Sequence, residues 1–229
     1  MTRHVHKLCV LLIVVALASV AAMPVAADRF EVTKIFFEYN STDNDLGVHV
    51  SLDAEHWTTL TITDPAGSSI FEVQGKGGYA ELGLTELFFE GAEPSLDEVP
   101  LARLLALFPE GRYTFSALTV DGHRLTNRAT LSHAIPAGPV VSSQLNGNSL
   151  IISWTGVTGP PAGFPNRPIT IAGYQVILEP FQVTLPATAR QVTVPPEFVA
   201  SLSSGAQLFE VLAIDASGNQ TITVGTFTK

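Results

Sequence analysis

The chain is a succession of short segments that are rich in β-branched and aromatic residues and separated by turn-forming residues. Residues 48–52 alternate apolar and polar side chains with a period of two, which is typical of a strand with one buried face. Residues 60–62 and 70–73 flank the sequence Asp64-Pro-Ala-Gly67, where proline presets the turn dihedral and glycine accepts a positive φ. This pattern limits the chain to short strands and hairpins, and it predicts an all-β fold.

One segment has the period of an amphipathic helix. Ser95 and Glu98 have the spacing of a capping box, and Pro100 presets a helical backbone at the start. Apolar side chains then recur at i, i+3, i+4 and i+7, which places them on one face: Leu101, Leu104, Leu105 and Phe108. The sequence predicts a helix near residues 95–108 that lies on a sheet, because so short a helix is only marginally stable alone in water. A weaker helical turn is predicted at residues 85–89.

A proline-rich linker divides the chain into two parts. Residues 135–139 contain two prolines, which stiffen the backbone and prevent regular strand pairing. Residues 28–135 combine strands with the helical insertion, and residues 136–229 contain about seven short strands, the number of an immunoglobulin-like sandwich. We therefore expect two immunoglobulin-like β-sandwiches in tandem, the first with a short helical insertion near residues 95–108.

The second part carries a family resemblance. Four segments follow Pro139 in order: Ser149-Leu-Ile-Ile-Ser-Trp154, Gly173-Tyr-Gln-Val176, Val192-Thr-Val-Pro195 and Phe209-Glu-Val-Leu-Ala-Ile-Asp-Ala-Ser-Gly218. Their order and spacing resemble a fibronectin type III domain over residues 136–229. The resemblance implies a spacer or binding surface in place of a catalyst, with a structural core that includes Trp154, Tyr174, Phe209, Val211 and Ala213.

Two positions depart from that family. Gln207 stands where fibronectin type III domains usually have the tyrosine of the tyrosine corner. The loop at residues 215–219 lacks the Arg-Gly-Asp tripeptide, so integrin-type adhesion is not implied. Residues 28–135 are not assigned to a characterised family.

The first 27 residues have the organisation of a signal peptide. Arg3 and Lys7 precede the apolar residues 8–22, and Val25 and Ala27 occupy positions −3 and −1 of a cleavage site. The alternative is a permanent membrane anchor, but the apolar run is shorter than the roughly 20 residues that a spanning helix needs. We expect cleavage and an exported protein, secreted or periplasmic, with no membrane span after cleavage.

Charge and cysteine content exclude several functions. Residues 1–27 hold two of the 12 basic side chains, none of the 21 acidic ones and the single cysteine, Cys9, so the remaining chain has a net charge of −11 and no thiol. A disulfide scaffold, a cysteine-ligated zinc site and a cysteine nucleophile are excluded in that chain. Without a basic cluster to neutralise phosphates, nucleic acid is not an expected partner.

The acidic turn after the first strand is a candidate calcium site. Asp43 and Asp45, with Asn40 before them and Gly47 after them, offer the oxygen ligands that Ca²⁺ prefers. The same residue types form turns without a metal, and the twelve-residue loop with a terminal glutamate is absent. Turn formation is the favoured interpretation, and no other cofactor is expected.

Catalytic patterns are weak. An acidic stretch at residues 81–98 could hold paired carboxylates, but it is more typical of a solvated surface around a helix start. The histidines beyond residue 27 are scattered, with His49 on the polar side of its strand, and neither His-Glu-x-x-His nor Gly-x-Ser-x-Gly is present.

Two aromatic residues are candidate ligand-binding residues. Trp57 and Tyr79 could form an exposed platform for a sugar or a protein, although a single tryptophan is more often part of a core.

The sequence thus favours an exported, non-enzymatic binding or structural module that acts through protein–protein recognition, with a protein or glycan partner in the envelope or outside the cell. The alternative is an accessory carbohydrate-binding module of an extracellular glycan-processing system. A hydrolase that uses the acidic stretch is a third hypothesis. Acids or imidazoles that converge in a water-shielded hollow would contradict the non-enzymatic interpretation.

Overall fold

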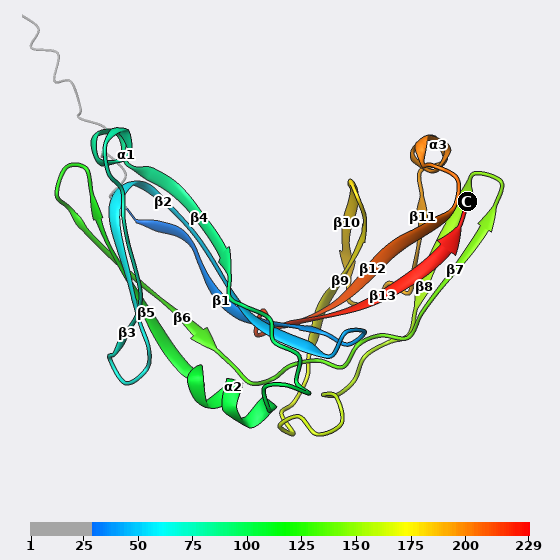
Figure 1. The fold of residues 1–229 in the computed structure, drawn as a ribbon, viewed down its shortest axis with the longest axis horizontal. Helices are drawn as coiled ribbons and strands as arrows, with labels where there is room; N and C mark the ends of the chain where they lie inside the picture. Colours follow the sequence, from blue (N-terminus) through cyan, green and yellow to red (C-terminus); the bar gives the residue numbers. More distant parts are fainter. Residues whose placement is uncertain (1–28) are drawn as a thin grey trace, which may run out of the picture.

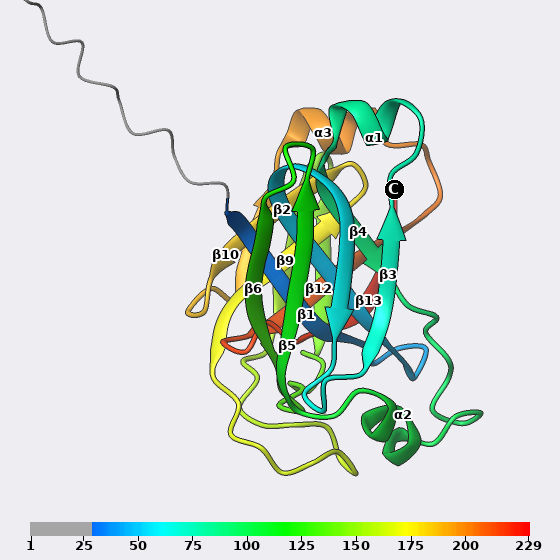
Figure 2. The same ribbon diagram turned by 90° about the vertical axis from the view of Figure 1, so that its left-hand side faces the viewer.

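The computed structural model describes residues 29–229, and the predicted signal peptide lies outside them. In this range the chain folds into thirteen strands and three short helices, which confirms the predicted all-β class. The strands form two β-sandwiches that meet at an angle, so that the molecule has the outline of a V (Figure 1). Figure 2 shows the first sandwich from its outer side, with β3, β5 and β6 toward the viewer.

The first sandwich contains the strands β1 (Phe30–Asn40), β2 (Asp45–Thr63), β3 (Ser69–Gln74), β4 (Leu84–Glu90), β5 (Gly111–Thr119) and β6 (Arg124–Leu131), with the helices α1 (Gly78–Leu82) and α2 (Leu101–Leu107). Strand β2 belongs to both layers. Its first half pairs with β1 and β4, and its second half pairs with β3 and β5. The pairing with both β4 and β5 shifts register near Trp57, and His56 has a φ of 49°. Such bends are how one strand passes between two crossed layers.

Helix α2 is shorter than predicted, because residues 95–99 form a separate turn. The backbone N–H groups of Glu98 and Val99 donate to the carbonyl of Ser95 at 3.0 and 2.9 Å. Pro100 follows with an extended ψ of 138°, and a residue that precedes proline is disfavoured in the helical region. The helix therefore begins only at Leu101, and Leu104 packs on the core beneath it.

The predicted helical turn at residues 85–89 is wrong. This segment is strand β4, which pairs with β2 from His49 to Trp57. Leu87 and Phe89 pack against the first core, whereas Phe88 between them is exposed, so the segment has the alternation of a strand.

The second sandwich contains β7 (Val141–Asn146), β8 (Ser149–Trp154), β9 (Ile171–Leu178), β10 (Phe181–Pro186), β11 (Gln191–Val194), β12 (Ala206–Asp215) and β13 (Gln220–Thr228), with α3 (Pro196–Ser201). A sheet ordered β11-β8-β7 faces a layer ordered β10-β9-β12-β13. The five side chains that the family resemblance placed in the core are all buried between these layers: Trp154, Tyr174, Phe209, Val211 and Ala213.

A parallel strand pair joins the two sandwiches. The end of β1 pairs with the beginning of β13, with Glu38 opposite Gln220 and Asn40 opposite Ile222, so that one ten-stranded sheet runs through both halves. Ser41, in the turn after β1, extends the ladder by donating from its N–H to the carbonyl of Ile222 at 2.9 Å.

Asn219 fixes this joint from within. Its side chain is fully buried, and its Oδ1 accepts a bond from the N–H of Phe37 at 2.8 Å. Its Nδ2 donates to the carbonyls of Ser132 and Ala134 at 2.7 and 3.1 Å. One side chain of the second sandwich therefore holds both β1 and the segment that follows β6 in the first.

Candidate functional site

The inner face of the V is formed by consecutive strands of the ten-stranded sheet (Figure 1). In β1, Ile35, Phe37 and Tyr39 are buried in the first core, so Phe36 and Glu38 lie on the opposite face. The same alternation in β12 sends Phe209 and Val211 into the second core and Leu208 and Glu210 outward. We call the outward face of β4, the first half of β2, β1, β13, β12 and β9 the inner face.

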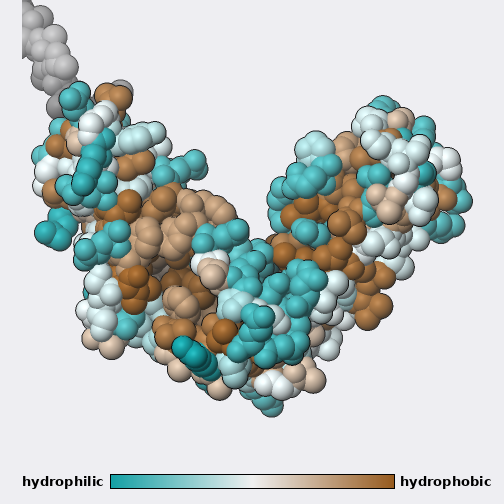
Figure 3. Space-filling view, viewed as in Figure 1, coloured by the Kyte–Doolittle hydropathy of each residue, from teal (hydrophilic) through white to brown (hydrophobic). Residues whose placement is uncertain are grey.

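The inner face is apolar on both arms and polar between them. Figure 3 shows brown side chains on both walls of the V and teal side chains between them at its floor. Phe88 is 61% exposed and Leu208 is 65% exposed, which is unusual for side chains of this size. By strand alternation the face also contains Phe36, Ile177, Ile214, Ile222 and Val224, and the acidic Glu38, Glu86, Glu90 and Glu210.

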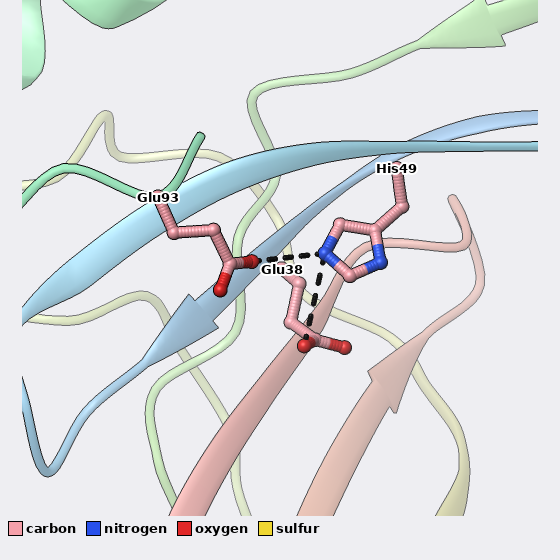
Figure 4. Close-up of side chains that lie close together, drawn as sticks. All are labelled: Glu38, His49 and Glu93. Atoms are coloured by element: carbon pink, nitrogen blue, oxygen red, sulfur yellow. Dashed lines mark hydrogen bonds and ion pairs between the residues drawn. The ribbon is translucent and has the colours of Figure 1, made fainter. Parts of the chain in front are cut away.

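Three side chains converge where the first sandwich meets the second. His49 Nε2 lies 2.9 Å from Glu93 Oε1 and 3.8 Å from Glu38 Oε1, and Figure 4 shows both carboxylates pointing at this nitrogen. Glu90 Oε2 lies 3.9 Å from it on a third side. His49 is 4% exposed, although it lies on the face of β2 that is turned away from the core.

Neighbouring elements hold each of these groups in place. Glu38 lies in β1 opposite Gln220 of β13, and the amide Nε2 of Gln220 donates to Glu38 Oε2. Glu93 follows β4 and crosses Gly47, where a Cβ atom would lie 2.5 Å from Glu93 Cγ. A glycine at position 47 is thus what allows Glu93 to reach His49.

Burial sets the electrostatics of this cluster. Burial is the main cause that raises the pKa of Glu38 above its ordinary value of 4.5, with smaller contributions in the same direction from Glu93 and Glu210. His49 and the bond from Gln220 act in the opposite direction. Glu38 is therefore a buried carboxylate among other acids, and it depends on His49 for compensation.

The sequence pattern does not predict that Glu38 and Glu93 lie beside His49. A signal existed for Glu38, because the turn formers at residues 41–44 favour a hairpin, and pairing across it places Glu38 beside Gly47 and Phe36 beside His49. No local signal indicates Glu93, which reaches the site from beyond β4.

The cluster has the composition of a binding site more than of a catalytic one. It offers one imidazole nitrogen and carboxylate oxygens, which can ligate a cation or hold a proton. It contains no serine, threonine or cysteine nucleophile, and none of its three residues lines the apolar hollow of about 370 Å³ beneath α2.

The predicted calcium ligands lie in a turn beside this cluster. Asn40 organises that turn: its Nδ2 donates to Asp43 Oδ2 at 2.9 Å, and its Oδ1 accepts the N–H of Thr42 at 3.0 Å. Burial, then Glu93 and Asp43, raise the pKa of Asp45. In the part of the chain that the structure describes, the side chains with metal-ligand spacing are Glu38, His49 and Glu93, and neither Asp43 nor Asp45 is among them.

The prediction of an exposed aromatic platform is wrong for Trp57. Its side chain is fully buried in the first core, because the bend in β2 turns it inward between Leu84 and Thr119, its strand partners. Tyr79 is 64% exposed on α1. The two side chains therefore do not form one surface.

The acidic stretch at residues 81–98 converges only in part. Glu90 and Glu93 approach His49, whereas Asp97 accepts a bond from Asn44 Nδ2 at 3.2 Å in the turn that precedes β2. Elsewhere, His133 Nε2 lies 2.9 Å from the carbonyl of Phe108, and His56 is exposed beside Glu55.

Comparison with known proteins gives no family. No family model matches the chain, and no curated protein matches it. Among solved structures it is similar to the Clostridium perfringens spore cortex lytic enzyme SleM, at 17% identity and a TM-score of 0.33, over 41% of this chain and 28% of that one. It is also similar to a tetra-tandem repeat from the extending region of a large adhesion protein, at 14% identity and a TM-score of 0.28, over 88% of this chain and 49% of that one.

A further similarity is to the Ig1 domain of mouse SynCAM 2, at 16% identity and a TM-score of 0.24, over 44% of this chain and 92% of that one. The chain thus spans less than half the length of the first two structures. Within residues 29–229, none of the helices has the length and apolar character that crossing a bilayer requires. Function is therefore argued from the chain's own residues.

Proposed function

We propose that this chain is an exported, non-enzymatic module that binds a protein partner along the inner face of the V. The observation that supports this most is the continuity of that face across both sandwiches, which the β1–β13 ladder and Asn219 hold at one angle. A surface that is already ordered before binding costs little conformational entropy when the partner docks.

The chemistry of the inner face defines the class of partner. Exposed apolar side chains such as Phe88 and Leu208 favour an apolar surface on the partner, and the glutamates among them favour basic side chains. The chain's overall charge of −9 acts in the same direction. We therefore propose a protein segment that combines apolar and basic residues.

The fibronectin type III resemblance is part of this proposal. It is supported by the three-stranded sheet that faces four strands and by the buried pair Trp154 and Tyr174, whose ring centroids lie 5.6 Å apart. At position 207, where fibronectin type III domains usually have a tyrosine, Gln207 Nε2 donates to the carbonyl of Ser203, four residues upstream, at 3.0 Å. That bond resembles the backbone anchor of a tyrosine corner.

Export is proposed from the signal-peptide organisation of residues 1–27. The carbohydrate-binding alternative is weaker than the sequence alone suggested, because a buried Trp57 cannot stack on a sugar.

The test is comparative capture from the medium and envelope fraction of the source organism, with the chain from residue 28 onward as bait. The double variant Phe88→Asp and Leu208→Asp changes the inner face. The matched control, Leu82→Asp and Val140→Asp, changes two apolar side chains that are at least as exposed, on α1 and directly before β7.

We expect the same protein to be captured by the parent chain and the control and to be lost with the inner-face variant. Equal capture by all three, or binding to a glycan array that the inner-face variant retains, would contradict the proposal.

A further inference from the structure

We propose that Glu38, His49 and Glu93 form a binding site for a divalent first-row transition metal ion such as Zn²⁺, at the floor of the V. This site goes beyond the proposed partner binding and does not depend on it.

The distances suit such an ion. Zinc binds imidazole nitrogen and carboxylate oxygen at about 2.0–2.2 Å, so two of its ligand atoms in a tetrahedron lie roughly 3.4 Å apart. The separations of His49 Nε2 from Glu93 Oε1 and Glu38 Oε1, 2.9 and 3.8 Å, lie on either side of that value. All three ligand atoms lie within 4.8 Å of one another. Side-chain adjustments toward that separation would complete three ligand positions and leave the fourth to water.

The donor set selects the class of metal. Calcium and magnesium take oxygen ligands almost exclusively, whereas an imidazole with carboxylates suits zinc and its neighbours in the first row. This cluster is therefore a different kind of site from the calcium site considered at Asp43 and Asp45.

Charge provides an independent reason for a cation. Within the described residues, all three ion pairs of His49 are with glutamates, and the side chain of Glu38 is only 14% exposed. The partly buried carboxylates of Glu38 and Glu93 beside a single imidazole leave an excess of negative charge, which is costly without a compensating cation. A divalent ion between Glu38 and Glu93 would offset it.

The surroundings orient the ligands as the outer shell of a metal site does. Gln220 occupies Glu38 Oε2 and leaves Oε1 facing the imidazole. The rings of Phe36 and Phe88 flank His49, with centroids 5.3 and 5.9 Å from it. The side chain of Glu93 is 34% exposed, which provides a route of entry from solvent.

Binding would have a structural consequence. The ion would join β1, β2 and the segment after β4, and through the Glu38–Gln220 bond it would stabilise the pairing of β1 with β13. On binding, Nε2 of His49 exchanges its contact with Glu93 for the metal, and the imidazole proton is carried on Nδ1.

The experiment uses metal-free protein from residue 28 onward, prepared with EDTA, and measures zinc binding by calorimetry and the melting temperature with added ZnCl₂. We expect one ion per chain and a rise in melting temperature of roughly 5–10 °C at a hundredfold excess over Kd. Cobalt(II) serves as a second probe, because its visible absorption is much stronger in a four-coordinate protein site than in the six-coordinate aqueous ion.

The variants separate a site from a general effect of charge. His49→Ala and Glu38→Gln should each weaken zinc binding at least tenfold and abolish the cobalt spectrum. Gly47→Ala should do the same although it changes none of the three ligand residues, since the added Cβ displaces the side chain of Glu93. His56→Ala, which removes an exposed histidine outside the cluster, should change neither measurement.

A Kd weaker than about 1 mM, or a Kd equal in the parent and in correctly folded His49→Ala protein, would overturn the proposal. Folding of each variant is checked by circular dichroism, and Gly47→Ala provides the decision if His49→Ala fails to fold.

Discussion

Asn219 shows how much of the fold can depend on one amide. Its three hydrogen bonds reach residues 85 to 182 positions away along the chain. In the sequence it is one more turn former after Gly218, because turn composition says nothing about such distant partners. The residue that fixes the angle between the arms therefore could not be predicted from local pattern.

Replacement of Asn219 should weaken the joint. Asn219→Ala leaves the buried N–H of Phe37 and two carbonyls unpaired, which should lower the free energy of unfolding by roughly 2–4 kcal/mol. Asn219→Asp keeps the shape but aims a carboxylate at two carbonyls, so it should be at least as destabilising. Urea denaturation measures both, with the exposed Asn127→Ala as control; equal stability of Asn219→Asp and the parent would contradict the assignment.

Tyr113 predicts a response to alkali. It is fully buried at the start of β5, and its hydroxyl donates to the carbonyl of Pro109 at 3.0 Å, a corner-type bond in the first sandwich. Burial, with a smaller contribution from Asp64, raises the pKa of Tyr113 from 10.0 to about 12. Because the folded-state pKa is the higher one, this stabilisation is complete below pH 10 and is lost as the pH rises to about 12.

The loss should amount to roughly 2–3 kcal/mol, since one pKa unit corresponds to about 1.4 kcal/mol. In urea titrations at pH 9 to 12, Tyr113→Phe should lose less stability than the parent over this range. The exposed Tyr79→Phe should behave as the parent does, and identical slopes for all three proteins would show that Tyr113 does not titrate as described.

At the scale of elements, most strands are predicted by the alternation of apolar and polar side chains. The segments that were predicted wrongly depend on pairing with distant strands. Leu87 and Phe89 fit a strand, but in so short a segment the spacing of apolar residues also fits a helical turn, and only pairing with β2 decides between them. Trp57 is buried for a similar reason, because the bend of β2 depends on the layers it connects. The positions of Leu87, Phe89 and Trp57 along the chain do not show which strands their segments pair with.

The junction of α1 and β4 gives a prediction with a matched control. Gly83 has a φ of +76°, and a Cβ there would lie 2.6 Å from the backbone of His56. Gly67 has a φ of +88° but nothing within 4 Å of its Cβ position. Both alanine variants carry the dihedral cost of about 1–3 kcal/mol, but only Gly83→Ala adds a clash with the backbone of His56. Gly83→Ala should therefore be the more destabilising by thermal and urea unfolding. Equal effects of the two variants would show that the backbone of β2 at His56 moves away from the added Cβ without loss of stability.

At the scale of the whole molecule, two loops connect the arms beside the sheet. Arg167, in the long loop of the second sandwich, pairs with Glu110 of the first, and the N–H of His133 donates to the same carboxylate at 2.7 Å. Burial alone would raise the pKa of Glu110, but these two donors hold it below its ordinary value of 4.5. The carboxylate of Glu110 thus binds the segment after β6 and the long loop of the second sandwich.

Glu110 should make the stability of the protein depend on pH in the acidic range. A lowered folded-state pKa contributes stability above about pH 4.5, and this contribution is lost as the pH falls through the folded-state value. Between pH 6 and 3, the melting temperature of Glu110→Gln should fall less than that of the parent. Glu81→Gln, an exposed change on α1, should follow the parent; a parallel decline of all three would exclude Glu110 as a contributor.

The two-sandwich class could be predicted from sequence, whereas the continuous sheet could not. The alternation of apolar and polar side chains in β1 and β13 would be the same whichever strand each of them paired with. The alternation therefore does not reveal this parallel pair, whose partners lie 182 residues apart. The inner face and the Glu38–His49–Glu93 cluster both depend on that pairing. This is why the sequence identified His49 only as a polar-face residue.

The direction of the β1–β13 pair also determines how the molecule would respond to tension. Only the end of β1 and the beginning of β13 overlap, and the two strands leave that overlap toward opposite ends of the chain. A pull applied between Phe30 and Thr228 would therefore slide the strands past each other and load their hydrogen bonds together, instead of opening them one at a time. Under such tension this short parallel overlap would resist separation of the two arms until its hydrogen bonds break together.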